Sequence, residues 1–222
     1  MALFDNVPQV TKNLLIINLI VFAATLINRE AMIMNFALFY PSSQYFHWWQ
    51  VITHMFMHGG FWHIFFNMYT LFIFGSVIER VIGSRKFLIL YFVCGLGAVA
   101  LHLGVEAVQA HSYMAAIADG SSRAIQQYQA LKFTPTLGAS GAIYGLLIAY
   151  AMLFPTARLT LIFPPVSLSA KTWVIIFAVI EMATGVTGLA DGVAHFAHLG
   201  GMLFGYLLIR RWRDNGDLFQ RY

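Results

Sequence analysis

Six apolar segments constrain the fold of this chain more than any other feature of its sequence. They cover about residues 13–28, 61–78, 87–105, 139–154, 172–189 and 193–209, and their lengths are close to the roughly 20 residues that a helix needs to cross a bilayer. The chain is 59% hydrophobic and only 10% charged, which excludes an ordinary soluble domain. The sequence therefore predicts an all-α membrane protein with six spans in a single domain, 1–222.

The basic residues predict the direction of the spans. With six spans, both termini lie on one side, which collects ten of the 13 Lys and Arg residues; the other side holds only Arg29, Arg123 and Lys132. Basic residues concentrate on the cytoplasmic side of membrane proteins, so we expect both termini in the cytoplasm. The net charge of +4 is then explained by topology and lipid headgroups, and no nucleic-acid partner is expected.

Three connections between the spans have a distinctive composition. Residues 31–60 are rich in aromatic side chains, which favours a structure lying partly in the membrane interface. Residues 106–135 are polar enough to leave the membrane, with a short helix predicted around 121–131. Residues 184–192 contain three glycines and are interpreted either as a mobile flap or as a tight turn.

A serine between glycines, in Gly138-Ala139-Ser140-Gly141, begins the fourth span. A 16-residue helix is about 24 Å long, whereas the bilayer core is about 30 Å thick, so this helix is expected to begin below the membrane surface. Irregular backbone at that depth must be buried in protein or border a water-filled cavity. Ser140 is therefore expected at a cavity, beside helix N–H groups that can donate to a developing negative charge. Taken alone, however, Gly141-x-x-x-Gly145 favours simple helix packing.

Polar side chains also open the second and sixth spans, which begin on the same outer side as the fourth. They are His63 and Asn67 in the second span and His195 and His198 in the sixth. Ionisable groups within a membrane are costly and usually face a cavity or the bundle interior. A serine nucleophile needs such a group as a base.

His198 is the preferred base, and His195 is the competing candidate. Gly201-x-x-x-Gly205 follows His198 and can pack closely against Gly141-x-x-x-Gly145, which would bring His198 to Ser140.

The remaining polar groups are given supporting roles. Glu181 and Asp191 are expected to lie outside the cavity, so the site is predicted to be a dyad without a carboxylate. His63 and Asn67 share one helix face and are interpreted as oxyanion donors, or else as ordinary buried polar residues. Tyr144 lies one turn after Ser140 and is expected to stack on the base or to be a core aromatic.

The histidines also allow a haem or metal-binding membrane protein. The candidate ligands are His54, His58, His63, His195 and His198. No cysteine cluster accompanies them and the H-E-x-x-H pattern is absent, which disfavours a metal site.

Together these residues resemble the rhomboid family of intramembrane serine proteases, and the resemblance extends over all six spans in order. The matching strings are Trp49-Gln50-x-x-Thr53-His54-x-x-x-His58-x-x-x-x-His63-x-x-x-Asn67, Glu79-Arg80-x-x-Gly83-Ser84, Gly138-Ala139-Ser140-Gly141 with Tyr144, and Ala197-His198-Leu199-Gly200-Gly201-x-x-x-Gly205.

The resemblance implies that Ser140 is the nucleophile and His198 the general base. His63, Asn67 and the Ser140 backbone N–H would stabilise the oxyanion, and Tyr144 would support the His198 ring. It further implies hydrolysis of peptide bonds in or near the transmembrane helices of substrate proteins, within a lipid bilayer. The fifth span and the link after it would act as gate and cap, and no metal or organic cofactor is expected.

Two departures from the family pattern and one alternative function remain. Gln50 stands where many members have Arg, and the 106–135 connection is long. The alternative is a catalytically silent relative that binds transmembrane helices, although the presence of both Ser140 and His198 argues against it. The compact six-span form favours a bacterial inner membrane.

Overall fold

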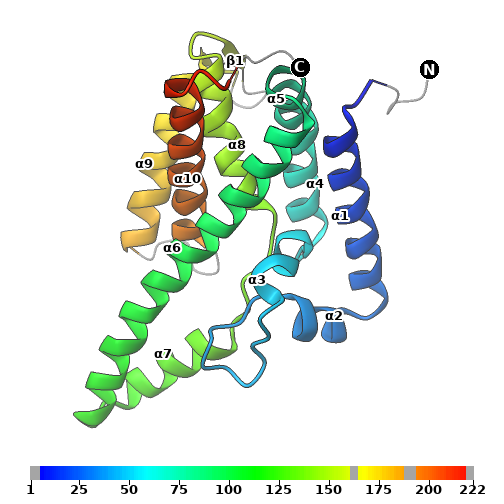
Figure 1. Cartoon of the computed structure of the whole chain (residues 1–222). Coiled ribbons are helices and arrows are strands. Elements are labelled where there is room, and N and C mark those ends of the chain that lie inside the picture. The colour runs from blue at the N-terminus through cyan, green and yellow to red at the C-terminus, as the bar shows by residue number, and fades with distance from the viewer. Residues whose placement is uncertain (1–5, 161–164, 188–193, 219–222) are drawn as a thin grey trace.

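The computed structural model describes residues 6–160, 165–187 and 194–218, which form a bundle of helices with a two-stranded sheet at one end (Figure 1). The helices are α1 (Gln9–Ile27), α2 (Arg29–Phe36), α3 (Gln50–Thr53), α4 (Phe61–Thr70), α5 (Ser76–Ile82), α6 (Ser84–Ala118), α7 (Ser122–Phe133), α8 (Ser140–Leu153), α9 (Ala170–Thr187) and α10 (His195–Asp214). A 3₁₀ turn at His54–Phe56 follows α3, and a π-helical turn at Leu71–Gly75 joins α4 to α5. Strands β1 (Arg158–Thr160) and β2 (Ser167–Ser169) pair antiparallel, with Leu159 opposite Leu168.

Among the described residues, four helical stretches are long and apolar enough to cross a membrane: α1, the continuous stretch Phe61–Ile82, α6 and α9. The shorter α8 has 14 residues, too few to cross the bilayer core alone. α10 has 20 residues and carries histidines in its first turn and arginines in its last. The predicted class, a mostly helical membrane protein, is confirmed, while the count of six spans stays a prediction.

The third span is longer than the sequence predicted. We expected it to end near residue 105, but α6 runs to Ala118 over 35 residues, or roughly 52 Å. The 106–135 connection therefore begins as a continuation of this helix, and the point at which it leaves the membrane stays a prediction. The predicted short helix around 121–131 is confirmed as α7, whose first turn is capped because the Ser121 hydroxyl accepts the N–H of Ala124. Figure 1 shows α6 and α7 reaching beyond the other helices at the end away from β1.

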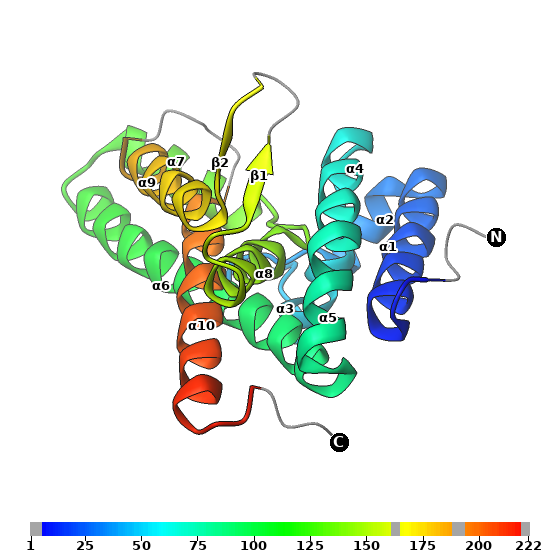
Figure 2. The ribbon, with the colours of Figure 1, turned by 90° about the horizontal axis from the view of Figure 1, so that it is seen from above.

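α8 lies at the centre of the bundle, among α4, α6, α9 and α10 (Figure 2). Glycines allow its backbone to touch that of α10. A Cβ added to Gly201 would lie 1.8 Å from the carbonyl oxygen of Gly141, and one added to Gly205 would lie 2.8 Å from that of Gly145. The predicted packing of the two glycine pairs is thus confirmed, and it brings the start of α8 against the start of α10.

Gln50 organises the first outer connection as a neutral anchor. Its side chain is fully buried. The Gln50 Oε1 atom accepts the N–H groups of Phe39 and His47, and Nε2 donates to the carbonyl oxygens of Met34 and Tyr45. Four hydrogen bonds from one amide therefore hold this connection without a charged anchor.

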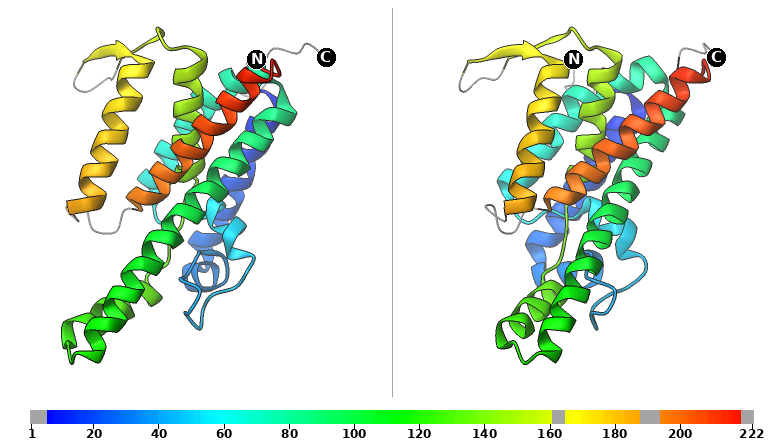
Figure 3. Two further views of the ribbon diagram at one scale, coloured as in Figure 1. Left: turned by 60° about the vertical axis from the view of Figure 1, so that its left-hand side comes forward. Right: turned by 90° about the vertical axis from the view of Figure 1, so that its left-hand side faces the viewer.

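α9 stands at the edge of the bundle beside α10, and the β1–β2 hairpin leads into it (Figure 3). Of the glycine-rich link between the last two spans, residues 184–187 belong to α9. Residues 188–193, including Asp191, lie outside the described residues, so the choice between flap and tight turn stays a prediction.

Candidate active site

An extended segment delivers Ser140 to the start of α8. Thr136 pairs with Leu38 in an isolated bridge through two backbone hydrogen bonds of 2.8 Å. Gly138 then turns the chain with φ of 132°, a conformation that favours glycine, and its N–H donates to the carbonyl oxygen of His54. α8 begins two residues later at Ser140. The first N–H groups of this helix have no acceptor within the helix, so they are available beside the hydroxyl.

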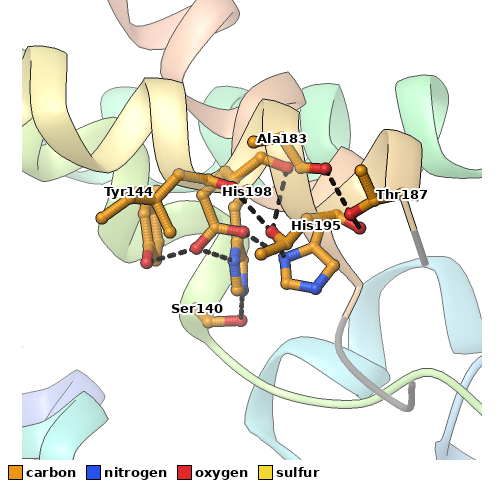
Figure 4. Close-up of polar contacts among 9 residues, drawn as sticks. Ser140, Tyr144, Ala183, Thr187, His195 and His198 are labelled. Atoms are coloured by element: carbon orange, nitrogen blue, oxygen red, sulfur yellow. Dashed lines mark hydrogen bonds and ion pairs between the residues drawn. The ribbon is translucent and has the colours of Figure 1, made fainter. Parts of the chain in front are cut away.

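The serine hydroxyl meets an imidazole from α10. Ser140 Oγ lies 2.8 Å from His198 Nε2. The ring of Tyr144, from the next turn of α8, stacks on the His198 ring with 4.2 Å between centroids and 5° between planes. Figure 4 shows the two rings face to face above Ser140. The His198 side chain is therefore held on one face by an aromatic ring and at its tip by the hydroxyl.

A carboxylate from α9 reaches the other nitrogen of this imidazole. Glu181 Oε1 lies 3.0 Å from His198 Nδ1 and accepts the hydroxyl of Tyr144 at 2.5 Å. The Nδ1 contact is at ion-pair distance but lacks the direction of a hydrogen bond. Glu181 does not line the cavity that holds Ser140, as expected, but the prediction of a dyad without a carboxylate is wrong. The Glu181 side chain points from α9 toward α8 and α10, because a carboxylate in an apolar helix needs polar partners.

His195 contacts the second oxygen of the same carboxylate. Its Nδ1 atom lies 2.6 Å from Glu181 Oε2 and 3.1 Å from the Thr184 hydroxyl. The Ser140 hydroxyl contacts His198 instead, as Figure 4 shows. The geometry therefore favours His198 over His195 as the partner of Ser140.

His63 and Asn67 are separated by the structure. His63 lines the cavity that holds Ser140 and His198. A Cβ added to Gly138 would lie 2.8 Å from His63 Nε2 and 3.7 Å from Ser140 Oγ, so both atoms face the same small region. Asn67 instead lines a neighbouring cavity of about 750 Å³ that also borders Tyr144.

The cavity around Ser140 has a volume of about 540 Å³ and includes a polar wall that the sequence did not indicate. His102 and Glu106, on α6, line it together with Thr136. His102 Nε2 lies 2.9 Å from the Thr136 hydroxyl and 3.4 Å from Glu106 Oε1. The two α6 residues are one turn apart near the predicted end of the third span. His102 lies inside the predicted span and Glu106 directly after it, and ionisable groups at such positions were the signal that could have identified them.

The histidines of the metal hypothesis are divided between different environments. Glu181, His195 and His198 have ligand atoms within 4.8 Å of one another, which is compatible with a divalent cation, but here these atoms contact one another. His54 Nδ1 instead donates to the Gln50 carbonyl oxygen. Burial lowers the pKa of His54 below its ordinary value, so this histidine is neutral and ties the first outer connection together.

The chain is similar to one family of known proteins. The family model of the Rhomboid domain matches residues 45–213, a range that contains every residue of the site described above. The rhomboid protease AarA of Providencia stuartii is 28% identical over 192 residues, which cover 85% of this chain and 65% of the relative. The mitochondrial presenilin-associated rhomboid-like protein of Mus musculus is 33% identical over 153 residues, 68% of this chain and 34% of the relative. The chain thus spans less than two thirds of the length of each.

Proposed function

Because this chain belongs to the rhomboid family, we propose that it is an intramembrane serine endopeptidase that hydrolyses peptide bonds in or near the transmembrane helices of other proteins. The observation that carries the proposal is the 2.8 Å contact between Ser140 Oγ and His198 Nε2 at a cavity among apolar helices. A nucleophile within hydrogen-bond reach of a base is the arrangement that acyl transfer needs. The similarity to AarA, a rhomboid protease, supports the same activity.

The reaction follows from this contact. Ser140 Oγ attacks the carbonyl carbon of an unwound substrate segment while His198 Nε2 takes the hydroxyl proton. The C–N bond then breaks, and the leaving amine receives that proton from Nε2. A water molecule attacks the resulting ester and gives a proton to Nε2. The C–Oγ bond breaks, Ser140 regains its proton, and the new carboxylate product leaves.

The oxyanion of each tetrahedral intermediate is stabilised by the Ser140 backbone N–H and by His63. Because His63 Nδ1 accepts the N–H of Gly59 at 3.4 Å, its Nε2 carries the proton in the neutral ring and can donate toward the region near Gly138. A donor of this kind contributes roughly 10²–10³ in rate. Asn67 lines the neighbouring cavity together with Tyr144, and because the family resemblance implies it, we assign Asn67 to the same role.

Glu181 acts as a positioning residue for His198. The Glu181 carboxylate lies 3.0 Å from His198 Nδ1 and favours a proton on that nitrogen, which leaves Nε2 to accept from Ser140. The same carboxylate stabilises the imidazolium that forms during attack. The Tyr144 hydroxyl holds Glu181, while its ring holds His198. The proposed catalytic group is thus a Ser–His pair oriented by a glutamate.

The chain is an integral membrane protein, and we propose a single rhomboid-like domain over 1–222 with six spans, both termini in the cytoplasm, and a bacterial inner membrane as its location. The start of α1 and the end of α10 lie at the same end of the bundle, away from α7 (Figure 1). The native cysteine Cys94 is buried, so maleimide labelling reports the introduced cysteines alone. Asp119→Cys is expected to react with an impermeant maleimide added outside intact cells, and Asn215→Cys only after lysis. The reverse pattern would exclude this topology.

Labelling with a fluorescent fluorophosphonate tests the proposed chemistry without knowledge of the substrate. Detergent-purified wild type should label, whereas Ser140→Ala and His198→Ala should not. Ser76→Ala and His111→Ala are matched controls, because Ser76 is a buried serine whose hydroxyl has no hydrogen-bond partner and His111 is exposed. Both controls should label like wild type. Folded wild type that does not label would refute the protease and favour the silent, helix-binding relative.

A further inference from the structure

One carboxylate in the cavity around Ser140 has no role in the proposed chemistry. Glu106 lies on the α6 wall of this cavity, and it is the only Asp, Glu, Lys or Arg among the described residues that line it. The same cavity contains Ser140 and His198. A substrate segment placed against Ser140 therefore shares its space with Glu106.

Among the described residues, Glu106 has no Lys or Arg as a partner. Glu106 Oε1 lies 3.4 Å from His102 Nε2, and the same Nε2 atom is closer to the Thr136 hydroxyl, at 2.9 Å. In the part of the chain that the structure describes, no Lys or Arg nitrogen lies within 4.0 Å of the carboxylate. The Glu106 side chain is only 15% exposed, so water solvates it poorly. The ionised carboxylate is costly in this position unless a charge of opposite sign pairs with it, and without such a charge the group tends to take up a proton.

The wall that carries Glu106 is fixed relative to the nucleophile. Thr136 is bonded through its side chain to His102 on α6 and through its backbone to Leu38. Ser140 follows four residues later, at the start of α8. Glu106 is thus held at a set position beside the site before any substrate enters, as a specificity pocket requires.

We propose that Glu106 binds a Lys or Arg side chain of the substrate, close in sequence to the bond that is cut. This inference rests on the proposed protease function and names the substrate class: membrane proteins with a basic residue beside the scissile bond. In the proposed topology the cavity opens on the outer side, where Lys and Arg are scarce in the flanks of membrane helices. A requirement for Lys or Arg at that position excludes most transmembrane helices in the same membrane. Such a requirement therefore selects substrates effectively.

Peptide binding tests this proposal independently of catalysis. The full-length Ser140→Ala protein in detergent is titrated against a fluorescein-labelled transmembrane peptide in which Arg is moved through the central and outer positions. Each peptide has a matched partner with citrulline, which has nearly the shape of Arg but no charge. At one or two positions we expect the Arg peptide to bind about tenfold more tightly than its citrulline partner, as a charge-assisted hydrogen bond would give. This ratio of the two dissociation constants should fall in high salt.

Variants at Glu106 identify the carboxylate responsible. In the Ser140→Ala background, Glu106→Gln should abolish the ratio, and Glu106→Asp should retain part of it. Asp119→Asn is the matched control, because it removes a carboxylate from the exposed end of α6 that does not line the cavity, and the ratio should persist.

Two results would overturn the proposal: equal binding of Arg and citrulline peptides at every position, or a ratio that survives Glu106→Gln. The first is read on protein with native Glu106, so it stands even if a variant fails to fold. Because binding needs no turnover, a failed fluorophosphonate labelling experiment leaves this measurement intact, and the two proposals fail separately.

Discussion

Replacing Gly201 by alanine should disable the site without touching any reacting group. The added Cβ would lie 1.8 Å from the Gly141 carbonyl oxygen, and its three nearest atoms all belong to the Gly141 backbone, so no side chain can rotate away. The helices would have to separate by about 1.5 Å to reach an ordinary contact. Gly141 adjoins Ser140, and Gly201 lies one turn after His198, so the same displacement stretches the 2.8 Å hydrogen bond beyond bonding distance. We expect the rate of fluorophosphonate labelling to fall by roughly 100-fold or more.

The unfolding midpoint of the same variant should fall as well, because overpacking a contact of this kind costs about 1–3 kcal/mol. Gly104→Ala on α6 is the matched control. It is also a helical glycine, but nothing lies within 4 Å of its added Cβ, and alanine is the better helix former. This control should label normally and unfold no earlier than wild type. Labelling of Gly201→Ala within about threefold of wild type, at an unchanged midpoint, would refute the inferred backbone contact between α8 and α10.

Three further outcomes are expected. Glu181→Gln should slow labelling roughly 100-fold while the protein stays folded, and Glu181→Asp should recover part of the rate; an unchanged rate in Glu181→Gln would remove the positioning role. Zinc ions should slow wild-type labelling by binding to Glu181, His195 and His198, and a chelator should restore the rate. Loss of labelling when a chelator alone is added would instead favour the metal hypothesis. Burial lowers the pKa of His54 and His58 in the folded protein, so as the pH falls below about 6.5 these histidines take up protons in the unfolded chain before they do so in the folded protein. The unfolding midpoint should therefore drop between pH 7 and pH 5, and the drop should be smaller in His54→Asn.

The sequence indicated the parts of the site that depend on local pattern. Ser140 was identifiable because glycines and a short apolar helix put a hydroxyl at membrane depth. His198 was identifiable because two glycine pairs of equal spacing favour close packing of two helices. The extension of α6 to Ala118 was not predicted, because helix propensity continues through residues whose polarity suggested a loop. The separation of His63 from Asn67 into two cavities also depends on how neighbouring helices close around α4, which one face of one helix does not determine.

The position of Glu181 could not be predicted from the sequence of its own helix alone. The sequence places it 17 residues before His198, in the middle of an apolar span, and nothing local says which way α9 turns it. The cost of a carboxylate in a membrane nevertheless restricts the answer, since such a group must meet donors from other helices. The donors it meets are Tyr144, His195 and His198. An ionisable residue inside a span is therefore better treated as part of the site until a partner elsewhere accounts for it. By the same reasoning Glu106, whose ion-pair contact among the described residues is with a shared histidine, is best explained by a partner that arrives with the substrate.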